Sequence, residues 1–283
     1  MQVETPNIIG LPVAYDRPVI FHGLNKSGSL VMADVMRDGY FRAGRAHQYI
    51  SNYHNVPREP EDHINIINHT RKGHAFFVAH YLYGFVTHPT AMWVTQVRHP
   101  VPRALSVHGW MKRNHLQREG NLDTFPDLTK WIRSTRGAKN TQMVQIALGG
   151  AYKSDVMKYS AAEISEMAIE NLERDFAWFG VAEIFEESIF ALASICDIPV
   201  VSAWKKDTRN QWREALADQD KLLLELLEET FQWEIRFYLK ALELFRSRIN
   251  ALRFGPGLAT YKEACSGQYG ERILVPTMDS ANA

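Results

Sequence analysis

The chain has 283 residues, of which 46% are hydrophobic and 23% charged, both near the globular average. Its 32 basic and 32 acidic side chains give no net charge to attract nucleic acid or an acidic membrane, so neither is expected as a partner. Cys196 and Cys265 form no Cys-x-x-Cys motif and predict neither a zinc site nor a disulfide framework. The start of the chain has no apolar run typical of a membrane span or a signal peptide, so a cytoplasmic protein is expected.

A strand, a polar loop and a helix are predicted in residues 17–37, RPVIFHGLNKSGSLVMADVMR, after a polar, proline-broken arm at 1–16. The apolar run 19–21 is typical of a buried parallel strand. Backbone N–H groups, the positive helix end and a lysine converge at the loop, which suits a phosphate or a sulfate. The alternative is an ordinary strand-to-helix turn. The loop residues predicted to bind the anion are Asn25, Lys26, Ser27, Gly28 and Ser29.

This loop differs from the nucleoside-triphosphatase motif, Gly-x4-Gly-Lys-Ser/Thr, whose hydroxyl binds magnesium. Lys26 precedes Gly28, and Leu30 occupies a position where a second hydroxyl is expected. The sequence therefore lacks that motif in its usual form.

Residues 39–72 contain few apolar runs and many polar groups, so an irregular segment on the acceptor side is expected there, with a helix at 61–68. A short buried strand at 76–78 follows and leads to His80.

A second strand–loop–helix unit is predicted at 92–113, MWVTQVRHPVPRALSVHGWMKR. Its strand ends at Arg98, and the prolines that follow are tolerated in the first turn of a helix. Arg103 and Ser106 are three residues apart and share a helix face, close to where Arg98 leaves the strand. Two guanidinium groups and a hydroxyl suit a dianionic phosphate. The two units together predict a nucleotide with phosphates at both ends of its ribose.

The next elements predicted are a polar loop at 114–127 and helices at 128–134 and 141–148. Ser160 and Glu163 form a capping box, whose helix is predicted to run to residue 174.

The last predicted elements are a strand at 176–182, a helix at 186–196 and a long helical stretch at 214–252. Apolar residues of that stretch are expected on one core face, at positions 222, 223, 226, 227, 231, 235, 238, 239 and 242.

Strands that alternate with helices predict an α/β fold: a P-loop-like parallel sheet flanked by helices, with a helical C-terminal portion. The site is expected at the carboxyl ends of the strands. We interpret 1–283 as one domain, with an arm at 1–16, a nucleotide-binding core at 17–200, a helical part at 201–255 and a loosely held tail at 256–283.

The two motifs resemble those of sulfotransferases that use 3′-phosphoadenosine 5′-phosphosulfate (PAPS). NKSGS is similar to their 5′-phosphosulfate loop, Pro-Lys-x-Gly-Thr/Ser-Thr, and VRHPVPRALSVH to their 3′-phosphate motif, Arg-Asp-Pro-x-x-Arg-x-x-Ser-x-Tyr. Residues 79–106 resemble the carbohydrate branch related to heparan 2-O-sulfotransferases, in which a Gly-His-x-x-x-Gly segment leads into the arginine motif. Segments 140–150 and 178–192 are also similar to that branch. The positions that depart from the pattern are Asn25, Leu30, Ala79, His99 and His108.

The resemblance implies direct, in-line transfer of a sulfuryl group from PAPS to a hydroxyl of a carbohydrate or small metabolite. The product is adenosine 3′,5′-bisphosphate, and no metal is required. His80 would be the general base, and Lys26 would stabilise charge on the bridging oxygen. Arg98 and Ser106 would bind the 3′-phosphate, with Arg103 as their neighbour.

Alternatives to this assignment remain. His80 could be a core histidine held by backbone hydrogen bonds. The runner-up function is a P-loop nucleotide-binding or kinase-like protein acting on ordinary nucleotides, against which the second arginine–serine site argues. A noncatalytic carbohydrate-binding scaffold would not need Lys26 and His80.

All 11 histidines lie between His22 and His115, but no His-Glu-x-x-His pattern arranges them as ligands, so no metal site is predicted. His22 is interpreted as structural. A basic segment could close over the nucleotide or be a solvated charge run: Lys205, Lys206 and Arg209. Three indoles could stack on adenine or a sugar, or pack in the core: Trp110, Trp131 and Trp204.

Overall fold

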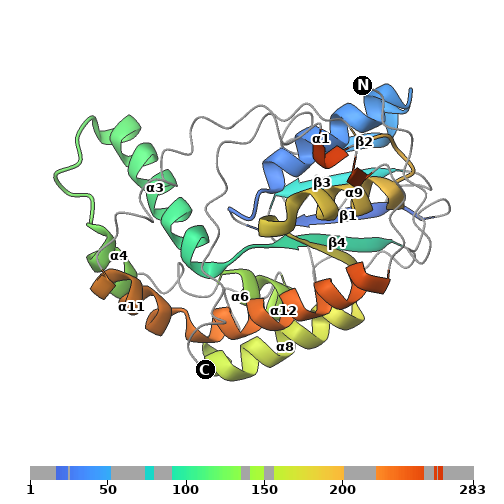
Figure 1. The fold of residues 1–283 in the computed structure, drawn as a ribbon. Helices are drawn as coiled ribbons and strands as arrows, with labels where there is room; N and C mark the ends of the chain where they lie inside the picture. The colour runs from blue at the N-terminus through green and yellow to red at the C-terminus, as the bar shows by residue number, and fades with distance from the viewer. Residues whose placement is uncertain are drawn as a thin grey trace.

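The computed structural model describes residues 17–24, 26–51, 74–79, 91–134, 141–149, 156–200, 221–251, 258–259 and 261–263. Within these residues, five parallel strands form one sheet in the order β2-β3-β1-β4-β5 (Figure 1). The strands are β1 (Val19–Gly23), β2 (Tyr49–Ser51), β3 (Ala75–Ala79), β4 (Met92–Val97) and β5 (Phe176–Val181). Every residue of β1 and β4 is buried, as expected for central strands covered on both faces.

Helices cover both faces of the sheet (Figure 1). One face carries α1 (Ser29–Arg42) and α9 (Phe185–Ile195). The other carries α6 (Thr141–Leu148), α8 (Ala161–Arg174) and α12 (Gln232–Ala251). The main hydrophobic core lies between these layers and the strands. The described part of the chain therefore has the predicted α/β architecture, a parallel sheet flanked by helices.

A second, smaller hydrophobic cluster lies beside the sheet, along α3 (Pro100–Glu119), which leads away from β4 (Figure 1). The helices α4 (Leu128–Ser134) and α11 (Lys221–Thr230) pack against it. Trp131 and Phe231 are its largest buried side chains. Three turns of 3₁₀ helix are also described: η1 (Ala46–Gln48), η3 (Val156–Lys158) and η4 (Ala182–Ile184).

Most elements predicted in the described range are confirmed. The strands at 19–21 and 76–78 correspond to β1 and β3, and the strand at 176–182 corresponds to β5. The capping box is present: the Ser160 hydroxyl accepts from the Glu163 N–H at 3.2 Å, and the Glu163 carboxylate accepts from the Ser160 N–H at 2.7 Å.

The polar loop predicted at 114–127 is wrong in its first half, because α3 continues to Glu119. The helix ends at Gly120, whose φ of 73° is left-handed and whose N–H donates to the Leu116 carbonyl at 2.9 Å. Residues 116–120 are exposed, and a solvent-exposed helical extension has no apolar periodicity to reveal it in the sequence.

The single core face predicted along 222–242 is also wrong. The helical stretch breaks at Phe231, and α11 packs on the second cluster whereas α12 packs on the main core, mostly against α8 and partly against β5. Leu222 and Leu239 are exposed, at 71% and 47%, because the two helices bury different faces. Four buried positions of α12 were not predicted: Glu234, Phe237, Ala241 and Phe245.

Among the described residues, no helix combines the length and the apolar character needed to cross a membrane. The arm at 1–16, the helix predicted at 61–68 and most of the tail after residue 255 lie outside those residues.

Candidate functional site

The loop between β1 and α1 lies at the carboxyl end of the central strand. Lys26 has a φ of 61° and Gly28 a φ of 93°, so two of its residues are left-handed. A lysine rarely adopts this conformation, and such backbone outliers cluster at functional sites. Gly28 is the N-cap of α1 and forms no side-chain cap, and its carbonyl accepts the first helical bond from Met32 N at 3.1 Å. The backbone of the loop and the N-terminus of α1 therefore meet at Gly28, an arrangement that an anion site requires.

The two serine side chains shape this loop from inside. Ser27 Oγ and Ser29 Oγ donate to the Leu24 carbonyl at 2.9 and 3.1 Å and lie 2.9 Å from each other. Both residues are buried. In this arrangement the hydroxyls hold the turn together, and the predicted donation from Ser27 and Ser29 to an anion stays a prediction.

Arg98 brings the second predicted motif to the first. It follows β4, the neighbour of β1 in the sheet, and its Nη1 donates to the Lys26 carbonyl at 3.1 Å. A guanidinium carries five N–H donors, so this contact does not by itself prevent Arg98 from binding an anion. The structure thus joins Lys26 and Arg98, which are 72 residues apart in the sequence.

Gln142 on α6 holds the backbone of Arg98 by two hydrogen bonds. Its Oε1 accepts from Arg98 N, and its Nε2 donates to Arg98 O, both at 2.8 Å. The amide therefore pairs with Arg98 as a neighbouring strand would, just beyond the end of β4. Gln142 is fully buried, so this contact is shielded from water.

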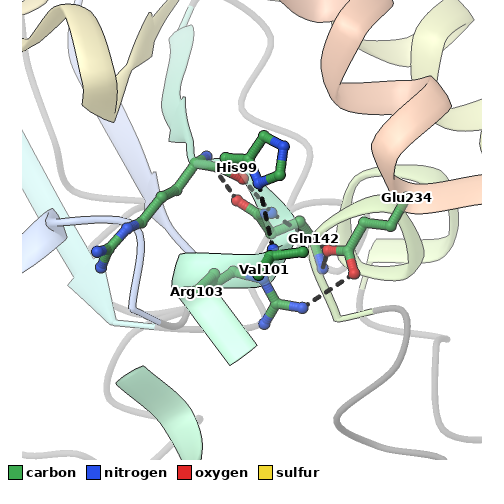
Figure 2. Close-up of polar contacts among 6 residues, drawn as sticks. His99, Val101, Arg103, Gln142 and Glu234 are labelled. Atoms are coloured by element: carbon green, nitrogen blue, oxygen red, sulfur yellow. Dashed lines mark hydrogen bonds and ion pairs between the residues drawn. The ribbon is translucent and has the colours of Figure 1, made fainter. Parts of the chain in front are cut away.

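Glu234 on α12 holds Gln142 in turn, and Arg103 holds Glu234 (Figure 2). The Glu234 Oε1 atom accepts from the backbone and side-chain nitrogens of Gln142 at 3.3 and 3.2 Å. Arg103 Nη2 donates to Glu234 Oε2 at 3.0 Å, and both side chains are 0% exposed. Burial raises the pKa of Glu234, and the charge of Arg103 opposes that shift.

This ion pair changes the interpretation of Arg103. Its guanidinium was predicted to lie beside the 3′-phosphate, but the structure places it in a buried pair with Glu234. We therefore omit Arg103 from the phosphate site proposed below. Ser106 lies one turn further along α3, where it is 8% exposed, and its predicted contact with a phosphate stays a prediction.

His99 caps α3 where the sulfotransferase pattern has aspartate. Its Nδ1 accepts from Val101 N at 3.3 Å, a role that an aspartate oxygen also fills. Burial and the neighbouring Arg98 charge lower the pKa of His99 to about 4, so the ring is neutral at neutral pH. Glu183 accepts from His99 N and from the Tyr238 hydroxyl, each at 3.0 Å. The departure at residue 99 therefore preserves the cap.

Several predicted site residues lie outside the described residues: Asn25, His80, Trp204, Lys205, Lys206 and Arg209. The residue before His80 in the sequence, Ala79, is described. β3 ends at Ala79, which pairs with Gly23 at the end of β1, and His80 is the next residue in the sequence. His22 is 1% exposed on β1, in keeping with a structural role.

A surface pocket of about 650 Å³ lies between α3 and the segment formed by α4 and the residues just before it. Trp110 and Trp131, the two described indoles that were predicted to stack or pack, both line it. Trp131 is 1% exposed and belongs to the second cluster, whereas Trp110 is 47% exposed. The pocket shares no residue with the loop or with Arg98, so it is not part of the site described above.

Gln142 and Glu183 lie in the segments 140–150 and 178–192 that resemble the family, but the sequence predicted no role for either of them, and it did not single out Glu234. Each is a single polar residue in an amphipathic helix or turn, and its partner is distant in the chain. Gln96 had a detectable signal, because it is a polar residue inside the apolar strand Trp93 to Val97. The structure buries it completely, next to the loop.

No three His, Cys, Asp or Glu side chains within the described ranges are grouped as metal ligands would be. Comparison of the sequence with protein-family models and with curated proteins gave no match.

Proposed function

We propose that this protein is a PAPS-dependent O-sulfotransferase built on a P-loop-like core. The sheet order supports the proposal, since β1 is central and leads directly into the loop and α1. The resemblance of the motifs indicates PAPS as the donor, and the acceptor is a hydroxyl of a carbohydrate or a small metabolite. Adenosine 3′,5′-bisphosphate is the released product, and the proposal includes no metal.

One observation carries the proposal: Arg98 Nη1 lies 3.1 Å from the Lys26 carbonyl. The two motifs were predicted to bind opposite ends of one nucleotide, and such a role requires them to be neighbours in space. The two hydrogen bonds from Gln142 support the proposal further, because they fix the backbone from which the Arg98 side chain extends. Preorganised cationic groups bind phosphates with less loss of conformational entropy.

The chemistry assigned to the residues is a single displacement at sulfur. His80 takes the proton of the acceptor hydroxyl as its oxygen bonds to sulfur, and the bond from sulfur to the bridging oxygen breaks. Lys26 stabilises the negative charge that develops on that oxygen, which leaves as part of adenosine 3′,5′-bisphosphate. Arg98 and Ser106 hold the 3′-phosphate and so align the donor.

We expect adenosine 3′,5′-bisphosphate to bind at least tenfold more tightly than AMP in isothermal titration calorimetry. Each charge-assisted contact to the 3′-phosphate contributes about 1.5–3 kcal/mol. Arg98→Ala should narrow the gap between the two nucleotides, while Arg133→Ala, exposed on α4, should leave it unchanged. Equal wild-type affinities would contradict the assignment, and tighter binding of ATP would favour an ordinary nucleotide-binding protein.

Lys26→Ala is expected to lower turnover by about 10²–10³, the scale for losing one positioned donor at developing charge. Donor affinity should fall only modestly, because the charge on the bridging oxygen is greater in the transition state than in the bound donor. The measurement is turnover under donor saturation, together with calorimetry. Lys130→Ala, at an exposed position on α4, is the control. A variant of Lys26 with wild-type turnover would remove this residue from the mechanism.

A further inference from the structure

Gln96 is an uncharged polar residue near the end of β4, two residues before Arg98. Its side chain is 0% exposed, and neither Nε2 nor Oε1 has a hydrogen-bond partner among the described residues. Buried amides nearly always have partners, because burial without one costs the free energy of desolvation. The exception therefore needs an explanation, and a functional one is suggested by where the amide points.

The amide faces the anion loop. A Cβ built on Gly28 would lie 3.2 Å from Gln96 Nε2 and 4.0 Å from the carbon of the same amide, its nearest described neighbours outside the adjoining loop and helix backbone. Gly28 is the N-cap of α1 and has a φ of 93°, so its position favours glycine for conformational reasons as well. The space beside the helix start is thus bounded by an amide whose hydrogen-bonding capacity is not used by the described residues.

We propose that Gln96 is a binding residue of the loop, whose Nε2 donates to an oxygen of a tetrahedral oxyanion held at the start of α1. This inference rests on the proposed function in placing such an anion there. Arg98 and Lys26 supply charge, whereas Gln96 supplies a directed hydrogen bond without charge. Such a neutral donor suits the 5′-phosphate of the nucleotide, whose unprotonated oxygens can only accept hydrogen bonds.

The chain offers a matched control in Gln145 on α6. It is also 0% exposed, and neither of its amide atoms has a partner among the described residues. Methionine at either position keeps the approximate length of the side chain and removes the amide. Both variants therefore lose one buried amide, but only Gln96→Met changes the group beside Gly28.

The test compares Gln96→Met, Gln145→Met and the wild type by thermal melting and by calorimetry with adenosine 3′,5′-bisphosphate. Gln96→Met is expected to melt no lower than the wild type and to bind the nucleotide about 10–100-fold more weakly, the scale for one hydrogen bond to a charged group. Gln145→Met should keep wild-type affinity. Unchanged affinity in Gln96→Met, or an equal loss in Gln145→Met, overturns the inference.

A second variant covers the case in which Gln96→Met does not fold. Gln96→Glu preserves shape and should bind more weakly as the pH rises, because the ionised carboxylate repels the anion. If the nucleotide affinity of Gln96→Glu depends on pH in the same way as that of the wild type, the inference is overturned. If the wild type binds ATP but not adenosine 3′,5′-bisphosphate, the proposed function fails and the same comparison is made with ATP. If it binds neither nucleotide, both proposals fail.

Discussion

Alanine in place of His80 is expected to lower turnover by about 10²–10⁴, the effect of removing a general base. Only a neutral imidazole can accept the proton of the acceptor hydroxyl, so the wild-type rate should rise with pH through the titration of this histidine. The variant should lose that limb of the profile. Donor affinity should stay unchanged, because the base contacts the acceptor and not the nucleotide. Turnover against pH and calorimetry with adenosine 3′,5′-bisphosphate measure the two effects.

His74 provides the control for His80. His74 precedes β3 in the sequence and His80 follows it, and the His74 carbonyl accepts from Val19 N at the amino end of β1. His74→Ala should therefore keep wild-type turnover and the same pH profile. Removing a general base lowers the rate at least about 10²-fold. If His80→Ala retains more than about a tenth of the wild-type activity, the loss is smaller than that, and the base is another residue. His88 and the carboxylates at 59–62 would then be the first to replace.

Arg103→Met is expected to reduce the free energy of unfolding by about 3–5 kcal/mol, the cost of leaving a buried charge without its partner. Its partner is Glu234, and both side chains are 0% exposed. The double variant Arg103→Met/Glu234→Leu removes both charges and should recover much of the loss. Urea unfolding of the wild type, the single variant and the double variant measures this, with Arg236→Met as the exposed control on α12.

The pH dependence of Arg103→Met has a definite sign. The pKa of Glu234 is already raised by burial, and removing the opposing charge of Arg103 raises it further. A carboxyl group with a raised pKa holds its proton better in the folded state than in the unfolded state. The unfolding free energy therefore falls as the pH rises from the unfolded-state pKa of Glu234 through its folded-state pKa. The deficit of the variant should thus be largest at neutral pH and shrink on acidification. A deficit that grew on acidification would contradict the assigned role of the pair.

The loop and Arg98 could be predicted from the sequence because their signals are local. A buried apolar strand followed by glycine, lysine and serine predicts the turn, and suggests the chemistry proposed for it, within about ten residues. The capping box at Ser160 is local in the same sense, and its helix was correctly bounded. The cap at His99 was less visible, because histidine is an uncommon capping residue and its role depends on the ring nitrogen.

The support behind Arg98 could not be predicted, because it is made of distant residues. Gln142 is 44 residues from Arg98, and Glu234 is 131 residues from Arg103. A glutamate in an amphipathic helix ordinarily faces water, and only the packing of α12 against α3 and α6 reverses that expectation. The spacing of Arg103 and Ser106 predicts that they share a helix face. It does not predict that Glu234 packs against Arg103 on that face.

The dependence of Arg98 on Gln142, and of Gln142 on Glu234, has a consequence for the order of events during synthesis. The strand and loop that contain the residues proposed to bind the anion leave the ribosome early, but Glu234 is made 131 residues after Arg103. A nascent chain that ends before α12 can pair its five strands, yet it has no Glu234 carboxylate to neutralise Arg103 in the interior. Closure of this contact over so long a separation is slow compared with local helix formation. The proposed anion site therefore reaches its final form only when the last quarter of the chain has folded onto it.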